Sequence, residues 1–253
     1  MIDAHLHADC RPFENFKEMN MAGIDAIISL AHDPLEMSQS IVSIEHLNRI
    51  VFNEAKRVEQ ANIKYYCGVG IHPRAIPKDY AVVLEKLPEY MEYDHVVAVG
   101  EIGLETTSKL EQEVFVKQLQ FADENNFNVI VHTPRTHKAE VTKTTIKLLE
   151  ENINPKLVQL DHIDFSIVDM AVDKEFTLGI TVQPLKMSPE DTVKMLGEYG
   201  FDQFVLDSDI SSAPSNHLSI AETKHELIKE GFCQKEIDKV TKVNVCNFYK
   251  NRI

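Results

Sequence analysis

Several features that the chain lacks already narrow its class. Its 253 residues hold no run approaching the roughly 18 apolar residues of a bilayer-spanning helix, which excludes a transmembrane protein. Lys and Arg number 26 against 40 Asp and Glu, so the net charge is 26 − 40 = −14. Because an acidic surface repels polyanions at long range, a protein that wraps or slides along nucleic acid is disfavoured. Capture of one phosphate group in a cleft stays compatible with this charge.

Cysteines at paired spacing are missing as well, and we expect no leader segment. The four cysteines show no Cys-x-x-Cys spacing; they are Cys10, Cys67, Cys233 and Cys246. They are typical of reduced thiols in a cytosolic protein rather than of a disulfide framework. Met1 leads directly into a strand-like segment without a basic or apolar leader, so we expect no secretory signal, a cytoplasmic location and no membrane partner. With 43% apolar and 26% charged residues the composition is that of a globular protein, which excludes disorder and a fibrous repeat.

Eight short apolar segments predict buried strands. They are Ile2–His7, Ala26–Ala31, Lys64–Ile71, Val96–Ile102, Val129–His132, Leu157–Ile163, Thr177–Val182 and Phe204–Asp207. Several contain continuous apolar runs, such as Val96–Val99 and Val129–Val131. Continuous runs, unlike alternating ones, fit strands that are covered on both faces, as in a parallel sheet.

Helical patterns separate these segments. They cover Glu36–Asn62, Ala81–Tyr93, Leu110–Asn126, His137–Asn152, Ser166–Lys174, Ser188–Gly200, His217–Lys229 and Glu236–Tyr249. The sixth has a clear start, because Ser188 can cap it, Pro189 suits the first turn and two acids follow at the positive end of the dipole. Gly200 is expected to end it.

This alternation of strand and helix predicts an α/β fold, a (β/α)8 TIM barrel, with a doubly wound open sheet as the alternative. A barrel of this kind routinely takes 200–250 residues as one domain. The chain has no Pro/Gly/Ser-rich linker and no internal repeat, so we expect one domain over residues 1–253. The C-terminal helices are expected to pack on the outside of the barrel.

Polar residues able to do chemistry stand at the carboxyl ends of the predicted strands, where barrel enzymes hold their active sites. They are His5, His7, His72, Glu101, His132, His162, Asp207 and Asp209. In the His-x-His pair both imidazoles point the same way, because side chains of a strand alternate. Each residue alone has an ordinary structural explanation; His162, for instance, could pair with Asp161 or Asp164.

Together these side chains predict a metal site. Imidazoles with carboxylates suit Zn²⁺, Mn²⁺, Fe²⁺ or Co²⁺, and a site richer in carboxylates suits Mg²⁺. Four of these histidines with two of the acids already exceed the needs of one ion, so we expect two divalent ions, Zn²⁺, Mn²⁺ or Mg²⁺, bridged by a carboxylate.

At this point the sequence resembles a known family, the TatD-like metal-dependent hydrolases within the amidohydrolase-type barrels. The resemblance rests on Asp3-Ala4-His5-Leu6-His7, Gly70-Ile71-His72-Pro73, Val99-Gly100-Glu101-Ile102-Gly103-Leu104, Val131-His132-Thr133, His162, Ser208-Asp209 and Asn247-Phe248. It implies that His5, His7 and Asp209 bind one ion. It also implies that Glu101 bridges to a second ion held by His132 and His162, with His72 binding substrate or supporting the ligands.

The residues that flank these motifs depart from the family pattern. The family usually has His-Cys-Phe where this chain has His162-Ile163-Asp164, and Asp where it has Glu105. After the last strand the family's Glu-Thr-Asp-Ser-Pro is replaced by residues 207–211, Asp-Ser-Asp-Ile-Ser. The family's Thr-Asp step matches Ser208-Asp209, which favours Asp209 as ligand and proton acceptor over Asp207. These departures indicate a divergent branch of archaeal type.

Basic residues also follow the strand ends: Arg11, Arg74, Arg135, Lys138 and Lys186. They are either solvated loop charges or an electropositive entrance suited to phosphate.

The whole pattern predicts a metal-dependent hydrolase that activates water at two ions, with Asp209, Glu101 and His72 as catalytic groups. Arg74, Arg135 or His72 would bind substrate and stabilise developing charge. The resemblance implies a nuclease acting on a small phosphodiester or a DNA end. A hydrolase of amides, lactones or other cyclic carbonyl compounds is the first alternative, and a non-enzymatic metal-binding protein is the second.

Overall fold

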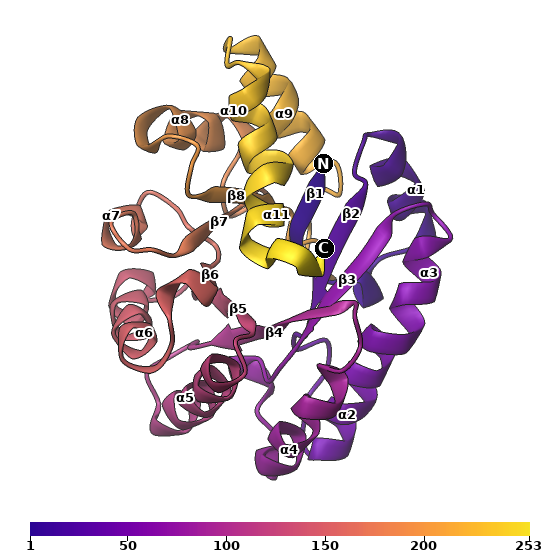
Figure 1. Cartoon of the computed structure of the whole chain (residues 1–253), viewed down its shortest axis with the longest axis vertical. Coiled ribbons are helices and arrows are strands. Elements are labelled where there is room, and N and C mark those ends of the chain that lie inside the picture. The colour runs from indigo at the N-terminus through magenta and orange to yellow at the C-terminus, as the bar shows by residue number, and fades with distance from the viewer.

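The computed structural model describes residues 1–253, leaving aside the side chain at position 251. Its centre is a sheet of eight parallel strands whose spatial order follows the sequence order (Figure 1). The strands are β1 (Ile2–Leu6), β2 (Ala26–Leu30), β3 (Lys64–Val69), β4 (Val96–Gly103), β5 (Asn128–His132), β6 (Val158–Leu160), β7 (Thr177–Thr181) and β8 (Phe204–Asp207). An order without reversal is that of a TIM barrel, so the doubly wound alternative is wrong.

The barrel closes where β1 meets the segment after β8, which we call the β1–β8 seam. The amide of His7 donates to the carbonyl of Ile210 at 3.0 Å, and the amide of Asp209 donates to the carbonyl of His5 at 2.9 Å. The buried carboxylate of Asp3 accepts a further bond from the Ser208 amide at 3.0 Å. The seam therefore fixes the His-x-His pair directly beside Asp209.

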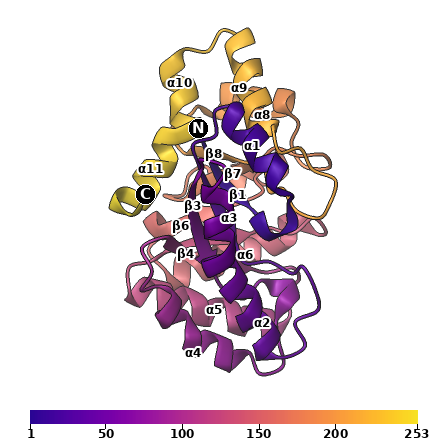
Figure 2. The same ribbon diagram turned by 90° about the vertical axis from the view of Figure 1, so that its right-hand side faces the viewer.

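Helices surround the barrel (Figure 2). They are α1 (Phe13–Met21), α2 (Ser40–Asn48), α3 (Ala55–Glu59), α4 (Tyr80–Tyr90), α5 (Lys109–Glu124), α6 (Lys138–Asn152), α7 (Val168–Ala171), α8 (Pro189–Tyr199), α9 (Ser219–Lys229), α10 (Gln234–Asp238) and α11 (Asn244–Tyr249). The expected start of α8 is confirmed, because the Ser188 hydroxyl accepts from the Asp191 amide at 3.0 Å. Gly200 ends that helix at a φ of +85°.

Two helices differ from the sequence prediction. The segment expected as one helix over Glu36–Asn62 begins at Ser40 and passes through π-helical turns at Arg49–Glu54 before α3. It begins at Ser40 because the carboxylate of Asp79, from the loop after β3, accepts from the Ser40 amide at 2.7 Å. Similar π-helical turns at Lys239–Val243 join α10 to α11.

The apolar core has two parts. The larger part lies between the strands and the surrounding helices and includes Leu6, Phe16 and Phe115. The smaller part fills the barrel interior with Ile28, Val97 and other side chains of β1, β2, β4, β5 and β8. Burial on both sides explains why the strands read as continuous apolar runs.

The C-terminal helix α11 does not lie on the outside of the barrel, where the sequence prediction placed it. Its Val245, Phe248 and Tyr249 belong to the interior cluster, and Asn128 at the start of β5 donates to the carbonyl of Phe248 at 3.1 Å. Figure 1 shows α11 crossing in front of the barrel. This helix therefore closes the amino-terminal opening of the barrel, and the carboxyl ends of the strands face the opposite side.

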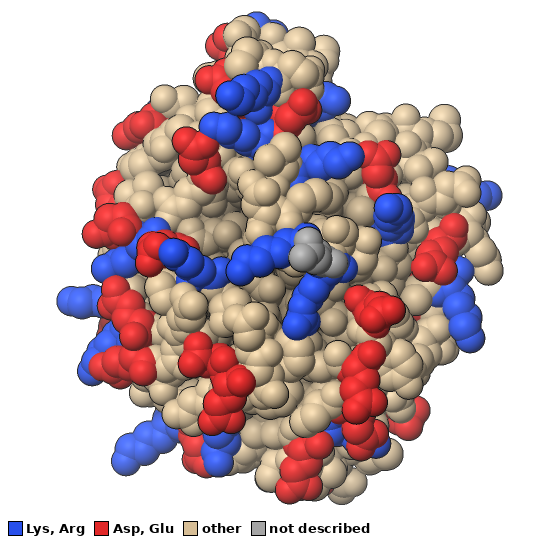
Figure 3. All heavy atoms as spheres, in the orientation of Figure 1, with Lys and Arg blue, Asp and Glu red and all other residues tan. Residues whose placement is uncertain are grey.

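The face that carries α11 has basic side chains near its centre and acidic ones mostly toward its edges (Figure 3).

Among the residues that the structure describes, no helix combines the length and the apolar character that a membrane crossing requires.

Candidate metal centre

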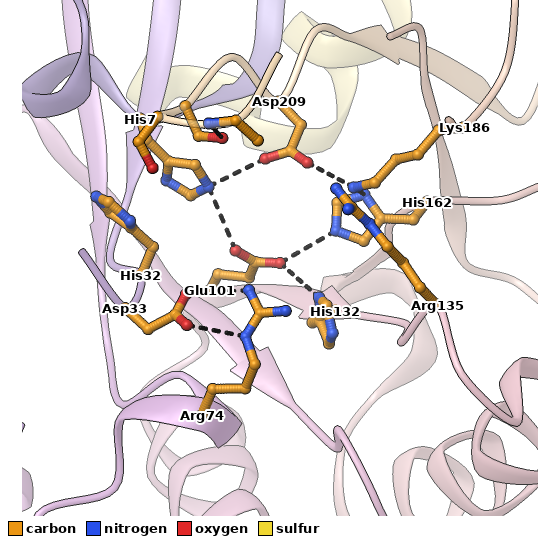
Figure 4. Close-up of a pocket in the computed structure, with 13 residues that line it drawn as sticks. His7, His32, Asp33, Arg74, Glu101, His132, Arg135, His162, Lys186 and Asp209 are labelled. Atoms are coloured by element: carbon orange, nitrogen blue, oxygen red, sulfur yellow. Dashed lines mark hydrogen bonds and ion pairs between the residues drawn. The ribbon is translucent and has the colours of Figure 1, made fainter. Parts of the chain in front are cut away.

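The polar side chains predicted from the strand ends meet at the carboxyl-terminal face of the barrel (Figure 4). They surround a cavity of about 220 Å³. Its lining consists of His7, His32, Asp33, Arg74, Glu101, His132, Arg135, His162, Lys186, Asp209, Ser211, Ser212 and Ala213. His5 and His72 lie beneath this lining and are at most 2% exposed. The topology thus brings together side chains that are up to 204 residues apart in the sequence, as His5 and Asp209 are (209 − 5).

Glu101, on β4, stands at the centre of two imidazole sets. Its Oε2 faces His5 Nε2 at 3.3 Å and His7 Nε2 at 3.7 Å. Its Oε1 faces His132 Nδ1 at 2.9 Å and His162 Nε2 at 3.2 Å. The two oxygens of Glu101 thus face two different imidazole sets.

Supporting groups hold one ring nitrogen of each ligand-type histidine and turn the other toward the cavity. His5 Nδ1 bonds to Asp161 at 2.8 Å, and His7 Nδ1 bonds to the carbonyl of Leu30 at 3.1 Å. The buried Nε2 of His5 has no hydrogen-bond partner among the described residues. Imidazoles that ligate metals are oriented in this way by a carboxylate or a carbonyl on the other nitrogen, so these residues fit a metal ion.

The second imidazole set has similar support. His162 Nδ1 lies 2.7 Å from Thr181 Oγ1 and 3.0 Å from Lys186 Nζ. His132 Nε2 bonds to Glu105 at 2.9 Å. The two ring nitrogens of His132 therefore face the carboxylates of Glu101 and Glu105. Glu101 also faces the first imidazole set, His5 and His7.

The two aspartates at the end of β8 have different surroundings. Asp209 lines the cavity, with Oδ1 at 3.0 Å from His7 Nε2 and Oδ2 at 2.5 Å from Lys186 Nζ. Asp207 is wholly buried, and neither of its oxygens has a partner among the described residues. Burial and the charge of Asp161 raise the pKa of Asp207 well above its ordinary value. Asp209 is therefore the one of the two acids that faces the cavity.

The charges of the site favour the metal-binding form of two carboxylates and of His162, whereas neighbouring carboxylates outweigh burial and raise the pKa of His5 and His132. Burial raises the pKa of Asp209, but the Lys186 ammonium, the hydrogen bond to His7 and the other imidazoles together hold that pKa well below the ordinary value. The pKa of Glu101 is also well below its usual range, because His5 and the other imidazoles oppose the effect of burial. Burial and Lys186 lower the pKa of His162. Ionised carboxylates and a neutral imidazole are the ligand forms that a divalent cation requires.

Two non-glycine residues of the site have left-handed backbones. The φ angles are +61° at His162 and +42° at Asp209. Such conformations cost about 1–3 kcal/mol each and persist where the surrounding structure imposes them, often at functional sites.

The basic residues that follow the strands divide into two groups. Arg74, Arg135 and Lys186 line the cavity. Arg11 instead donates to the carbonyl of Ser211 at 2.9 Å, and Lys138 pairs with Asp164 at 2.7 Å. Of the two alternatives, an electropositive entrance therefore does not include Arg11 and Lys138, because their side chains hold loops.

Several supporting residues were not recognised from the sequence. Asp161, considered as a partner of His162, bonds to His5 instead. Asp33 pairs with Arg74 at 2.9 Å, and Gln183 Nε2 donates to Asp209 at 2.7 Å. The alternation of side chains gave a signal for Asp161, because it directly follows β6 and lies on the same side as Gln159, whose Nε2 donates to it at 2.9 Å.

Known proteins with the same fold match nearly the whole chain. The sequence model of the TatD related DNase family matches residues 2–250. An uncharacterized metal-dependent hydrolase of Methanocaldococcus jannaschii is 36% identical over 252 residues, covering 99% of this chain and 100% of that protein. The crystal structure of a TatD-like protein from Archaeoglobus fulgidus superimposes with a TM-score of 0.84 at 30% identity, covering 99% of this chain and 100% of that one.

More distant structures share the barrel. The phosphotriesterase homology protein of Escherichia coli has a TM-score of 0.75 at 14% identity, with 98% of each chain covered. At that identity the likeness shows the fold alone. The family match across the whole chain, together with the ligand-type side chains at the strand ends, shows that the protein belongs to the TatD family and is a metal-dependent hydrolase.

Proposed function

We propose that this hydrolase cleaves phosphodiesters, either small ones or those at the end of a DNA strand, at a site for two divalent ions. The observation that carries the two-ion site is the position of Glu101, whose oxygens face His5 and His7 on one side and His132 and His162 on the other. When bound, two such ions polarise the substrate and lower the pKa of a water molecule toward neutrality.

The charges that line the cavity support an anionic substrate. The acids Asp33, Glu101 and Asp209 are balanced by Arg74, Arg135 and Lys186, so the lining sums to 3 − 3 = 0 with the histidines neutral. Every divalent ion therefore adds its full charge to a cavity that is otherwise neutral. A phosphodiester gains from this field, whereas a neutral amide or lactone gains much less.

Each side chain then has a defined task. Asp209, ionised and beside His7, accepts a proton from the attacking water. Arg135 has no ion pair within the described part of the chain, so its guanidinium is available for two phosphate oxygens. Arg74 is already engaged by Asp33 at 2.9 Å, so it contributes charge from a fixed position.

The size of the cavity supports a small substrate group. At about 220 Å³ the cavity lies below the roughly 300–1,000 Å³ of typical ligand pockets. A phosphate with part of one nucleoside fits such a space. Internal duplex DNA would in addition meet the acidic surface of the chain.

Steady-state kinetics test the proposal with bis(p-nitrophenyl) phosphate and a neutral lactone as substrates. Losing one charge-assisted hydrogen bond costs about 1.5–3 kcal/mol, so Arg135→Ala should lower kcat/KM for the phosphodiester by roughly 10–100-fold, mainly through KM. Bound metal should not change. Arg135→Lys should recover only part of the loss, because an ammonium cannot bind two oxygens in the same plane.

The matched control is Lys143→Ala, which removes one exposed charge from α6 and should change neither substrate. Equal effects of Arg135→Ala on both substrates, or none on either, would refute the phosphodiester proposal and favour the lactone or amide alternative. Linear and circular single-stranded DNA separate cleavage at ends from internal cleavage. Equal rates on both would exclude the preference for ends.

A further inference from the structure

A second cluster of ligand-type side chains lies beside the metal centre, and one of its members, His32, also lines the cavity of that centre. Asp9 belongs to the short turn Ala8–Cys10 after β1, His32 follows β2, and His46 lies on α2. His32 Nε2 is 2.9 Å from Asp9 Oδ1 and 3.1 Å from Oδ2. His46 Nε2 is 3.3 Å from Asp9 Oδ2, and Cys10 Sγ is 3.7 Å from His32 Nε2.

His46 gives a second observation that points to a ligand at this cluster. Its side chain is only 7% exposed, and its Nε2 points toward Asp9. Within the described part of the chain this buried nitrogen has no hydrogen-bond partner of acceptable geometry. A buried polar atom without a partner costs free energy, and a bound cation is one way to remove that cost.

The turn that carries Asp9 and Cys10 is held rigidly. Arg49 donates to the carbonyl of Asp9 at 2.9 Å, and Arg57 donates to the carbonyls of Ala8 and Arg11. Both guanidinium groups are fixed by the buried carboxylate of Glu54, which lies at the end of the π-helical turns. The backbone of the cluster is therefore positioned before any ligand binds.

We propose that Asp9, Cys10, His32 and His46 form a zinc site separate from the centre around Glu101. One carboxylate, one thiolate and two imidazoles form a ligand set typical of Zn²⁺. Ligand atoms around a tetrahedral zinc ion stand roughly 3.2–3.8 Å apart, given bond lengths of about 2.0–2.3 Å. Asp9, Cys10 and His32 already place their ligand atoms within 4.8 Å of one another. His46 Nε2, 3.3 Å from Asp9, would shift toward Cys10 and His32 to complete the set.

The cluster has a route to solvent. A cavity of about 620 Å³ on the side of α2 is lined by Asp9, Cys10 and His46. An ion can therefore reach the second cluster without passing through the cavity around Glu101.

The two sites touch through one pair of rings. The imidazoles of His32 and His7 stack with centroids 4.1 Å apart. A zinc ion on His32 would fix that ring against His7, whose Nε2 faces Asp209 at 3.0 Å. The proposed ion is thus placed to stiffen one wall of the hydrolytic centre.

Cobalt titration tests the proposal, because Co²⁺ takes zinc sites and reports on its ligands. The centre around Glu101 offers imidazoles and carboxylates, whereas the proposed site offers the thiolate of Cys10. Metal-free wild-type protein titrated with CoCl₂ should therefore develop a thiolate-to-cobalt charge-transfer band in the near ultraviolet. The band should vanish in Cys10→Ser and persist in Cys233→Ser, which alters an exposed cysteine elsewhere.

Elemental analysis of zinc-loaded protein gives a second measurement. His46→Gln should lose one equivalent of zinc relative to wild type. Circular dichroism checks that each variant is folded. If a variant does not fold, the cobalt titration of the wild-type protein still tests for the thiolate ligand. Saturation of the wild type with cobalt without a charge-transfer band would overturn the proposal, as would a band that survives in Cys10→Ser.

Discussion

Replacing Asp161 by asparagine removes one hydrogen-bond acceptor from beneath the metal centre. Both oxygens of the Asp161 carboxylate accept bonds: Oδ2 from His5 Nδ1 at 2.8 Å and Oδ1 from Gln159 Nε2 at 2.9 Å. An asparagine has one side-chain oxygen, so one of the two donors would face an amide N–H instead. The side chain is completely buried, and water cannot take the place of the lost acceptor.

Two effects should follow, and their sizes can be worked out. An unsatisfied buried donor costs about 1–3 kcal/mol. In a chain of this length 1 kcal/mol corresponds to about 2–4 °C, so the Tm of the metal-free variant should fall by about 2–12 °C. Loss of a carboxylate partner from a ligating histidine typically weakens metal binding by about 10–100-fold.

A competition titration with a chromogenic chelator measures the affinity, and a thermal melt of the metal-free protein measures the stability. Asp169→Asn is the matched control, because Asp169 bonds to Tyr199 at the surface, away from the centre. The double variant Asp161→Asn/Gln159→Leu removes the second donor, so it should regain stability while its metal affinity stays low. An Asp161→Asn protein with wild-type affinity and wild-type Tm would refute this account of how His5 is held.

Three further results are expected. His5→Ala and His132→Ala should each lower the metal content in elemental analysis, because they belong to different imidazole sets; unchanged content in both would contradict the two-ion site. Chelation should leave the far-UV circular dichroism intact, because hydrogen bonds and the apolar core close the barrel, and outright unfolding would show that the ions are structural. Gly179→Ala should lower the Tm, since its Cβ would lie 1.9 Å from Asp161 Oδ1. Gly197→Ala, with ordinary contacts inside α8, should stabilise the fold by about 0.5–1 kcal/mol, and a lower Tm would contradict that contrast.

Much of the architecture followed from local patterns. The eight strands were predicted because strands buried on both sides must be apolar at consecutive positions, as in Val96–Val99. The start of α8 was predicted because Ser188 and Pro189 act within their own turn. The start of α2 was missed because its cap comes from Asp79, which is 39 residues further along the chain.

The sequence by itself determined the barrel and the identity of the side chains that meet at its carboxyl-terminal face. It could do so because parallel strands of a closed barrel must bring their ends together, whatever the connecting loops do. Only the tertiary structure decided which partner each side chain has. Asp161 supports His5 across 156 residues, Arg11 and Lys138 hold loops instead of lining the cavity, and α11 covers the barrel's far opening. Such pairings depend on distances between side chains of different strands and loops. The pattern of apolar and polar residues within one segment does not predict those distances.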